Sequence, residues 1–304
     1  MEPSICPTNP HGPIMSHDQS LQIYNHFLGT VHPLIKTTAQ ISRYGHRSEL
    51  TSANPLCRLG AKVYSQNDED GITIEILRRL ELHQGTFAEF GVGNGTENNT
   101  LVLVASGWRG FWVGGETLAF NFNPRNAKNL NFHFRQSWIT LDNVLALYEA
   151  GLEAIRGSSC DVVSIDLDGN DYHLVAAMLE FGIAPSLFIA EYNAKFRPPI
   201  QFVMPYDEAH QWKGDDYFGA SLSSFVNLFE RHGYFLACCN ATGANAFFVR
   251  KDHHARFPDV PKDLFDLYEA PKYFLTGLDS SGHPASIRTI EHFMSVQNPG
   301  SDIP

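Results

Sequence analysis

Residues 87–100 read Phe-Ala-Glu-Phe-Gly-Val-Gly-Asn-Gly-Thr-Glu-Asn-Asn-Thr, and the rest of the fold can be worked out from this stretch. Its first four residues are apolar apart from Glu89, which predicts a short buried strand. The glycines that follow favour a tight turn at which a ligand can approach the backbone. They are Gly91, Gly93 and Gly95. The apolar run 101–105 then predicts a helix. Strand, glycine turn and helix are typical of a nucleotide-binding βα unit, and an ordinary strand–helix turn is the plain alternative.

The glycine spacing narrows the choice of nucleotide. It is G-x-G-x-G, not the dinucleotide pattern G-x-G-x-x-G, and no phosphate-gripping lysine follows. The acid Glu89 suits a ligand with a cationic or hydroxyl-rich end better than a pyrophosphate. The helix start is expected to offer free N–H groups to that ligand. S-adenosylmethionine, with an ammonium, a sulfonium and a ribose diol, fits this description, and we predict it as the cofactor.

Further apolar segments end in polar side chains. Residues 111–116 end in Glu116, residues 161–168 end in acids, and residues 187–193 end in Glu-Tyr-Asn. The polar residues at the ends of the last two segments, or just beyond them, are Asp166, Asp168, Asp171, Glu191, Tyr192 and Asn193. In open parallel sheets, ligands bind beyond the carboxyl ends of the strands. The sequence therefore predicts that these side chains share one ligand site.

Strand and helix patterns alternate along the chain, which indicates an α/β fold. Two strands at 234–239 and 246–250 form a hairpin that would close the sheet. We expect a Rossmann-like methyltransferase three-layer sandwich with a mostly parallel, seven-stranded sheet, an antiparallel last strand and an N-terminal helical cap. The expected organisation is a flexible tail at 1–20, a helical cap or lid at 21–62, the Rossmann-like domain at 63–252 and a C-terminal extension at 253–304.

Composition excludes some functional classes. The 304 residues carry a formal net charge of −11, which lacks the overall basic character of a nucleic-acid-binding protein. Five cysteines form no zinc or C-x-x-C spacing, and we expect Cys238 and Cys239 to be buried free thiols in a reducing compartment. With no signal peptide and no apolar stretch long enough to cross a bilayer, we expect a cytoplasmic protein without membrane partners. The sequence leaves a homodimer open.

Several stretches resemble a known family. Glu89-Phe-Gly-Val-Gly-Asn-Gly-Thr-Glu-Asn-Asn, Ser164-Ile-Asp-Leu-Asp-Gly-Asn-Asp-Tyr and Glu191-Tyr-Asn are similar to motifs of FkbM-related, S-adenosylmethionine-dependent, class I methyltransferases. The resemblance covers roughly residues 64–250. Such enzymes usually carry Asp-x-Glu-Gly at the fourth strand, and here Asp168 replaces the Glu, which shortens the reach by one methylene.

The resemblance implies roles for individual residues. Glu89 and the glycine turn, with Asn98, would hold the methionine part of the cofactor. Glu116 would grip the ribose hydroxyls, because a carboxylate accepts two hydrogen bonds side by side. The segment Gln136–Trp138, which includes Ser137 and Trp138, would lie at the adenine edge. Asp166 would complete the cofactor site.

Methyl transfer from a sulfonium needs an aligned nucleophile, and a base where that nucleophile carries a proton. The candidates for these roles are Asp168, Asp171, Glu191 and Tyr192, with His173 and His210 as weaker ones. A helix cap is the plain alternative for Asp171. The aromatic loop at 194–220 is expected to bind a small-molecule substrate, because loops this long in a compact domain are usually functional or disordered.

Three alternatives stay open. In the first, Asp166, Asp168, Asp171 and Glu191 converge on Mg²⁺ or Ca²⁺, although no metal is favoured. Attack on another sulfonium carbon would give cyclisation or aminocarboxypropyl transfer with methylthioadenosine as by-product. A non-catalytic binding protein that keeps the fold is the third alternative. A dehydrogenase is disfavoured by the glycine spacing.

Overall fold

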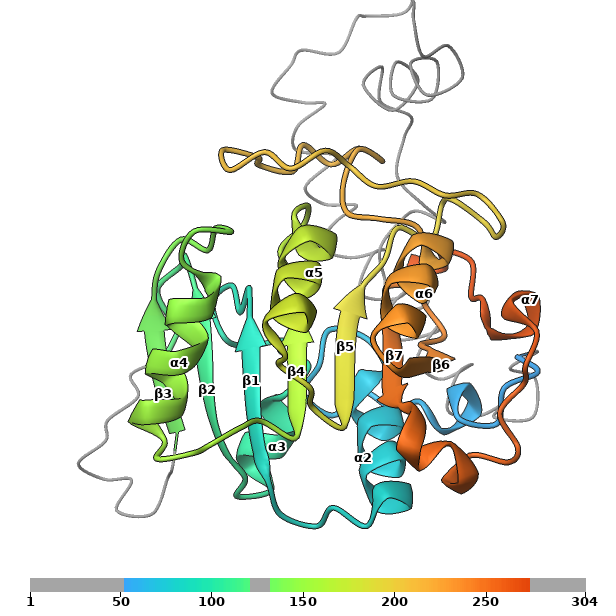
Figure 1. The fold of residues 1–304 in the computed structure, drawn as a ribbon, viewed down its shortest axis with the longest axis horizontal. Coiled ribbons are helices and arrows are strands. Elements are labelled where there is room, and N and C mark those ends of the chain that lie inside the picture. Colours follow the sequence, from blue (N-terminus) through green and yellow to red (C-terminus); the bar gives the residue numbers. More distant parts are fainter. Residues whose placement is uncertain (1–51, 121–131, 274–304) are drawn as a thin grey trace, which may run out of the picture.

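A seven-stranded sheet organises the computed structural model, which describes residues 52–120 and 132–273 (Figure 1). The strands are β1 (Thr86–Phe90), β2 (Arg109–Gly114), β3 (Phe132–Gln136), β4 (Val162–Ile165), β5 (Leu187–Glu191), β6 (Tyr234–Cys239) and β7 (Asn245–Arg250). Their order is β3-β2-β1-β4-β5-β7-β6. Strand β7 runs antiparallel to both of its neighbours, and the other pairs are parallel. This topology confirms the predicted fold class.

Helices cover both faces of the sheet and make three layers (Figure 1). They are α2 (Glu69–Leu80), α3 (Leu101–Ala105), α4 (Val144–Ala154), α5 (Asp171–Phe181), α6 (Leu222–Arg231) and α7 (Leu264–Leu267). Side chains alternate across each strand, so Ala88 and Phe90 pack toward α4, α5 and α6, whereas Phe87 packs toward α2 and α3. The strands other than the edge strand β3 are buried on both faces, which explains their apolar sequences.

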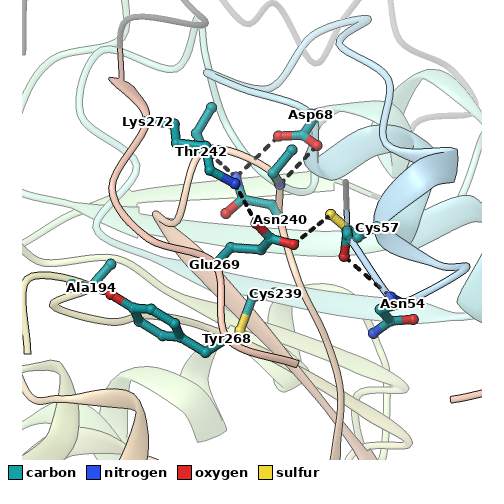
Figure 2. Close-up of polar contacts among 12 residues, drawn as sticks. Asn54, Cys57, Asp68, Ala194, Cys239, Asn240, Thr242, Tyr268, Glu269 and Lys272 are labelled. Atoms are coloured by element: carbon teal, nitrogen blue, oxygen red, sulfur yellow. Dashed lines mark hydrogen bonds and ion pairs between the residues drawn. The ribbon is translucent and has the colours of Figure 1, made fainter. Parts of the chain in front are cut away.

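The segments that flank the sheet pack against its β6–β7 end. A 3₁₀ turn at Cys57–Leu59 lies beside the C-terminal segment, where the Cys57 thiol donates to Glu269 over 3.6 Å (Figure 2). Asp68 accepts hydrogen bonds from the Ala241 N–H and the Asn240 side chain. Residues on both sides of the predicted 63–252 domain therefore contribute to one core. The predicted tail at 1–20 and most of the cap at 21–62 lie outside the described residues, and so does the chain after residue 273.

The element boundaries differ from the predicted ones in a few places. In the described part of the predicted helical cap at 21–62, the helical structure is the 3₁₀ turn, which Pro55 precedes. The predicted C-terminal extension at 253–304 contains the short helix α7, whose N-cap is Asp263. Cys238 and Cys239 are buried free thiols, as predicted. Within the described ranges, no helix combines the length and apolar character needed to cross a membrane.

A network of charged side chains connects helix α2 with Asp259 in the C-terminal segment. Glu75 accepts hydrogen bonds from Arg78 and Arg79, and Arg79 also pairs with Asp259. The hydrogen bond from Arg78 is the largest influence on the pKa of Glu75, which falls to about 2. Because the Glu75 and Arg79 side chains are only 15% and 12% exposed, this pair is better shielded from solvent than most surface ion pairs.

We expect Glu75→Gln to lower the free energy of unfolding at pH 7 by about 1–2 kcal/mol. The folded-state pKa of Glu75 is depressed, so its contribution is complete above about 4.5 and is lost as the pH falls toward about 2. Urea unfolding of the wild type and the variant at pH 7 and at pH 3 measures the difference in the free energy of unfolding at each pH. Glu153→Gln on the exposed face of α4 is the control. A pH-independent difference would contradict this account.

Candidate functional site

The glycine turn after β1 packs tightly against the start of the β4–α5 loop. Gly91 has a φ of 91°, and its N–H donates to the Val113 carbonyl over 2.8 Å. A Cβ at Gly91 would lie 1.7 Å from the Asp166 carbonyl oxygen. Gly93 differs, because a Cβ there would meet nothing within 4 Å. The turn is therefore closed toward β4 at Gly91 and open at Gly93.

Glu89 does not have the partners that the sequence suggested. It is 2% exposed, and its carboxylate accepts hydrogen bonds from the N–H groups of Asn99 and Thr100 and from the Thr100 hydroxyl. Burial raises the pKa of Glu89, and the hydrogen bonds from Thr100 and Asn99 oppose that rise. The N–H groups expected to be free at this helix start are thus used by Glu89, and α3 has only five residues. Through these three hydrogen bonds, Glu89 holds the turn against the start of α3.

Asn98 lies in the same turn. It is 5% exposed, and its side-chain amide donates to the Val92 carbonyl over 3.1 Å. Its Oδ1 is buried and has no hydrogen-bond partner among the described residues. Asn98, which was predicted to bind the cofactor, therefore has an amide oxygen beside the glycines without a hydrogen-bond donor in the described part of the chain.

The expected ribose and adenine residues lie next to each other. Glu116 follows β2 and is exposed, and the Trp138 ring lies 3.4 Å from where a Cβ of Gly115 would be. Trp138 is 54% exposed, and its Nε1–H donates to the Glu208 carbonyl. Ser137 donates its N–H to the Gly114 carbonyl at the end of β2. An exposed aromatic face beside an exposed carboxylate is suited to a nucleoside.

Three acids converge at the carboxyl ends of β4 and β5. One carboxylate oxygen from each of Asp166, Asp168 and Glu191 lies within 4.8 Å of the others. Burial, reinforced by nearby carboxylates, raises the pKa values of Asp166 and Glu191 well above their usual range. Burial also raises the pKa of Asp168, and this effect is opposed by nearby His210. The predicted convergence of these three side chains is observed, and their oxygen atoms could hold a hard cation.

Asp168 has an unusual backbone conformation. Its φ is 54°, which is uncommon for a residue other than glycine. Its backbone lies near the Glu191 carboxylate and opposes the rise in the pKa of Glu191, and its own carboxylate is close enough to Glu116 for that charge to raise the pKa of Asp168. Asp168 therefore connects the acid cluster with the expected ribose site.

Two of the residues expected to be catalytic point elsewhere. Asp171 is fully buried, and its carboxylate accepts hydrogen bonds from the N–H groups of Leu167 and Gly169 at 2.7 and 3.0 Å. Burial raises the pKa of Asp171 to about 6. Tyr192 is also fully buried, and its hydroxyl donates to the Glu269 carbonyl in the C-terminal segment. Asp171 braces the β4–α5 turn and Tyr192 anchors the extension, so neither is placed to act on a substrate.

The loop at 194–220 runs across the carboxyl ends of the strands (yellow to orange at the top of Figure 1). Asn170 and Asp207 exchange two hydrogen bonds, and His173 contacts the Met204 carbonyl over 2.7 Å. The His210 ring packs on Gly169 so closely that a Cβ there would lie 2.4 Å from it. The loop expected to bind substrate is therefore fastened over the acid cluster.

Sequence reasoning missed Glu69 and Asn245. The Asn245 side-chain amide donates to Glu69 over 3.1 Å, and Glu69 is close enough to Asp166 for its charge to contribute to the raised pKa of Asp166. Glu69 looked like an ordinary acid at a helix start. Asn245 looked like part of a tight turn. The available signal was a polar residue, Asn245, directly before the apolar strand predicted at 246–250.

The chain resembles known proteins in its fold but not closely in its sequence. No protein-family model and no curated protein matches the chain. Similar solved structures include precorrin-6y C5,15-methyltransferase from Geobacter metallireducens GS-15, with 15% identity over 63% of this chain and 93% of that chain and a TM-score of 0.34. An S-adenosylmethionine-dependent methyltransferase from Clostridium acetobutylicum shares 10% identity over 60% and 90%, with a TM-score of 0.37.

The N-terminal domain of EvdMO1, solved in the presence of SAH and D-fucose, is 11% identical over 70% of this chain and 97% of that chain, with a TM-score of 0.38. With identities and TM-scores this low, these similarities carry no argument about activity. The strand order of the sheet shows the fold by itself.

Proposed function

We propose that this protein is an S-adenosylmethionine-dependent methyltransferase of the FkbM-related group that methylates an oxygen or nitrogen of a small molecule. The observation that carries this proposal is that the exposed Trp138 lies against Gly115, directly before the exposed Glu116, while Gly93 with its open position lies near Gly114. A carboxylate can accept both hydroxyls of a ribose, and an aromatic face can stack on adenine. When bound, S-adenosylmethionine supplies an electrophilic methyl group on a positively charged sulfur.

The chain's own residues fit such a ligand. A Cβ at Gly93 would enter free space, so a ligand can reach the backbone there. Asn98 keeps a buried acceptor available beside the turn. Asp168 and Glu191, two members of the acid cluster, lie under the loop at 194–220, where the Asp168 carboxylate would accept the proton of a substrate hydroxyl or amine.

Calorimetric titration with S-adenosylmethionine tests the cofactor assignment. We expect saturable binding to the wild-type chain, and Glu116→Gln should weaken it about tenfold or more, because hydrogen bonds to a charged acceptor are lost. Glu149→Gln, an exposed glutamate on α4, is the matched control and should bind normally. Absence of binding to the wild-type protein would overturn the proposal and favour a non-catalytic binding role.

The by-product identifies the reaction. Incubation of the protein and cofactor with a pool of small hydroxyl- and amine-bearing compounds should release S-adenosylhomocysteine, which mass spectrometry detects. Release of methylthioadenosine would instead show attack on another carbon of the sulfonium. That result would keep the cofactor site and replace methyl transfer as the activity.

A further inference from the structure

A row of three oxygen-bearing side chains crosses the carboxyl edge of the sheet. Ile165 pairs with Ala190, and Glu191 pairs with Asn245, so Asp166, Glu191 and Asn245 come at one level on the neighbouring strands β4, β5 and β7. Residues at one level and of one alternation phase share a face of the sheet. Val162 and Ile189, which have this phase, pack toward α2, so the row faces α2 as well.

Two members of this row have acceptors that lack donors. Glu191 Oε2 and Asn245 Oδ1 are both buried and have no hydrogen-bond partner among the described residues. Asn245 is 2% exposed, and its Nδ2 is directed to Glu69 Oε1, which leaves its Oδ1 pointing away from Glu69. Directly opposed residues have Cβ atoms about 4.5–5.5 Å apart, so these two unpartnered oxygens belong to the same small region. A buried acceptor without a donor is costly, and a cation between the two would remove that cost.

The spacing of the acids suits a hard cation. The ligating oxygens of Asp166, Asp168 and Glu191 lie within 4.8 Å of one another. Oxygens on opposite sides of a bound Ca²⁺ are about 4.6–5.2 Å apart, and those around Mg²⁺ are closer, at about 4.0–4.2 Å. Carboxylate and amide oxygens are the ligands these ions prefer, whereas zinc favours nitrogen and sulfur.

We propose that Asp166, Asp168 and Glu191, together with the Asn245 amide oxygen, bind one divalent hard cation of the Mg²⁺, Mn²⁺ or Ca²⁺ class at the carboxyl edge of β4, β5 and β7. The cation relieves repulsion among three crowded carboxylates and supplies the missing partner of two buried oxygens. Binding of the cation does not depend on the proposed methyl transfer. A site here lies under the loop at 194–220, where it can hold an oxygen-bearing ligand.

Direct metal binding tests this proposal without any cofactor. The full chain is treated with EDTA, and Mn²⁺ binding is followed by electron paramagnetic resonance and calorimetry, with Mg²⁺ and Ca²⁺ as competitors. We expect a single saturable site. Asp168→Asn, which changes the most exposed of the three acids, and Glu191→Gln should each weaken Mn²⁺ binding about tenfold or more. The competitor that displaces Mn²⁺ at the lower concentration identifies the preferred ion.

The control is Asp142→Asn, which alters an exposed acid in the turn before α4 and should leave Mn²⁺ binding unchanged. Circular dichroism verifies that each variant is folded. The proposal is overturned if millimolar Mn²⁺ does not bind the wild-type chain, since protons or water would then satisfy the cluster. It is also overturned if folded Asp168→Asn and Glu191→Gln proteins both bind Mn²⁺ as tightly as wild type.

Discussion

Gly91→Ala is expected to reduce the free energy of unfolding by about 3–5 kcal/mol, enough to leave much of the protein unfolded near body temperature. The added Cβ would lie 1.7 Å from the Asp166 carbonyl oxygen and 2.7 Å from its carbonyl carbon. Both are backbone atoms next to the end of the central strand β4. The clash therefore cannot be relieved by a change of side-chain rotamer. The φ of 91° adds strain for any residue with a Cβ. Urea unfolding followed by circular dichroism measures the loss.

Gly93→Ala separates this packing effect from a binding effect. Gly93 also has a positive φ, of 50°, but a Cβ there meets nothing within 4 Å. We expect only about 1–2 kcal/mol of destabilisation, the usual penalty for a left-handed residue. Because the methyl group enters the space assigned to the ligand, affinity for S-adenosylmethionine should fall about tenfold or more. Equal destabilisation by the two substitutions would contradict this distinction.

The sequence was sufficient to predict the sheet and the meeting of three acids at its carboxyl edge. Each apolar strand that ended in an acid indicated one point on the carboxyl edge, and parallel strands bring such points together. Asp166, Asp168 and Glu191 meet for this reason. Prediction succeeded here because the signal is local to each strand and the topology adds only the order of the strands.

The sequence could not predict which polar groups compete for each acid. Glu89 precedes the glycines and was expected to meet the ligand, but the nearby backbone of Asn99 and Thr100 takes its carboxylate first. Asp171 is similarly taken by the turn that precedes it. These partners are near in the sequence, but the amino-acid sequence alone does not show which conformation each side chain adopts.

Asn245 illustrates a different limit. Its place beside Glu191 depends on the register of an antiparallel strand that is far away in the sequence. A slip by one residue would move the Asn245 side chain to the opposite face of the sheet. The hydrogen-bond partner of Tyr192 is also far away in the sequence, because Glu269 belongs to a segment outside the resemblance. Long-range register and flanking segments therefore carry the part of the site that the motifs did not reveal.

Glu89→Gln is expected to destabilise the protein by about 2–4 kcal/mol, because an amide N–H₂ would replace an acceptor that faces backbone N–H donors. The carboxylate accepts from Asn99 and from both the N–H and hydroxyl of Thr100, and the Thr100 hydroxyl also accepts from the Trp112 indole. The substitution keeps the side-chain volume, so the loss reflects the hydrogen bonds and not a cavity. Thermal and urea unfolding measure it at pH 7.

Cofactor affinity of the same variant decides between the two roles considered for Glu89. If Glu89 acts only by holding the start of α3, folded Glu89→Gln protein at low temperature should bind S-adenosylmethionine within about threefold of wild type, since no direct hydrogen bond to the ligand is lost. Thr100→Val removes only the hydroxyl of that network and should destabilise less, by about 1–2 kcal/mol. A large loss of affinity in Glu89→Gln with little loss of stability would return Glu89 to direct contact with the ligand. The buried position of its carboxylate, 2% exposed and already paired with three donors, is the reason to expect the opposite.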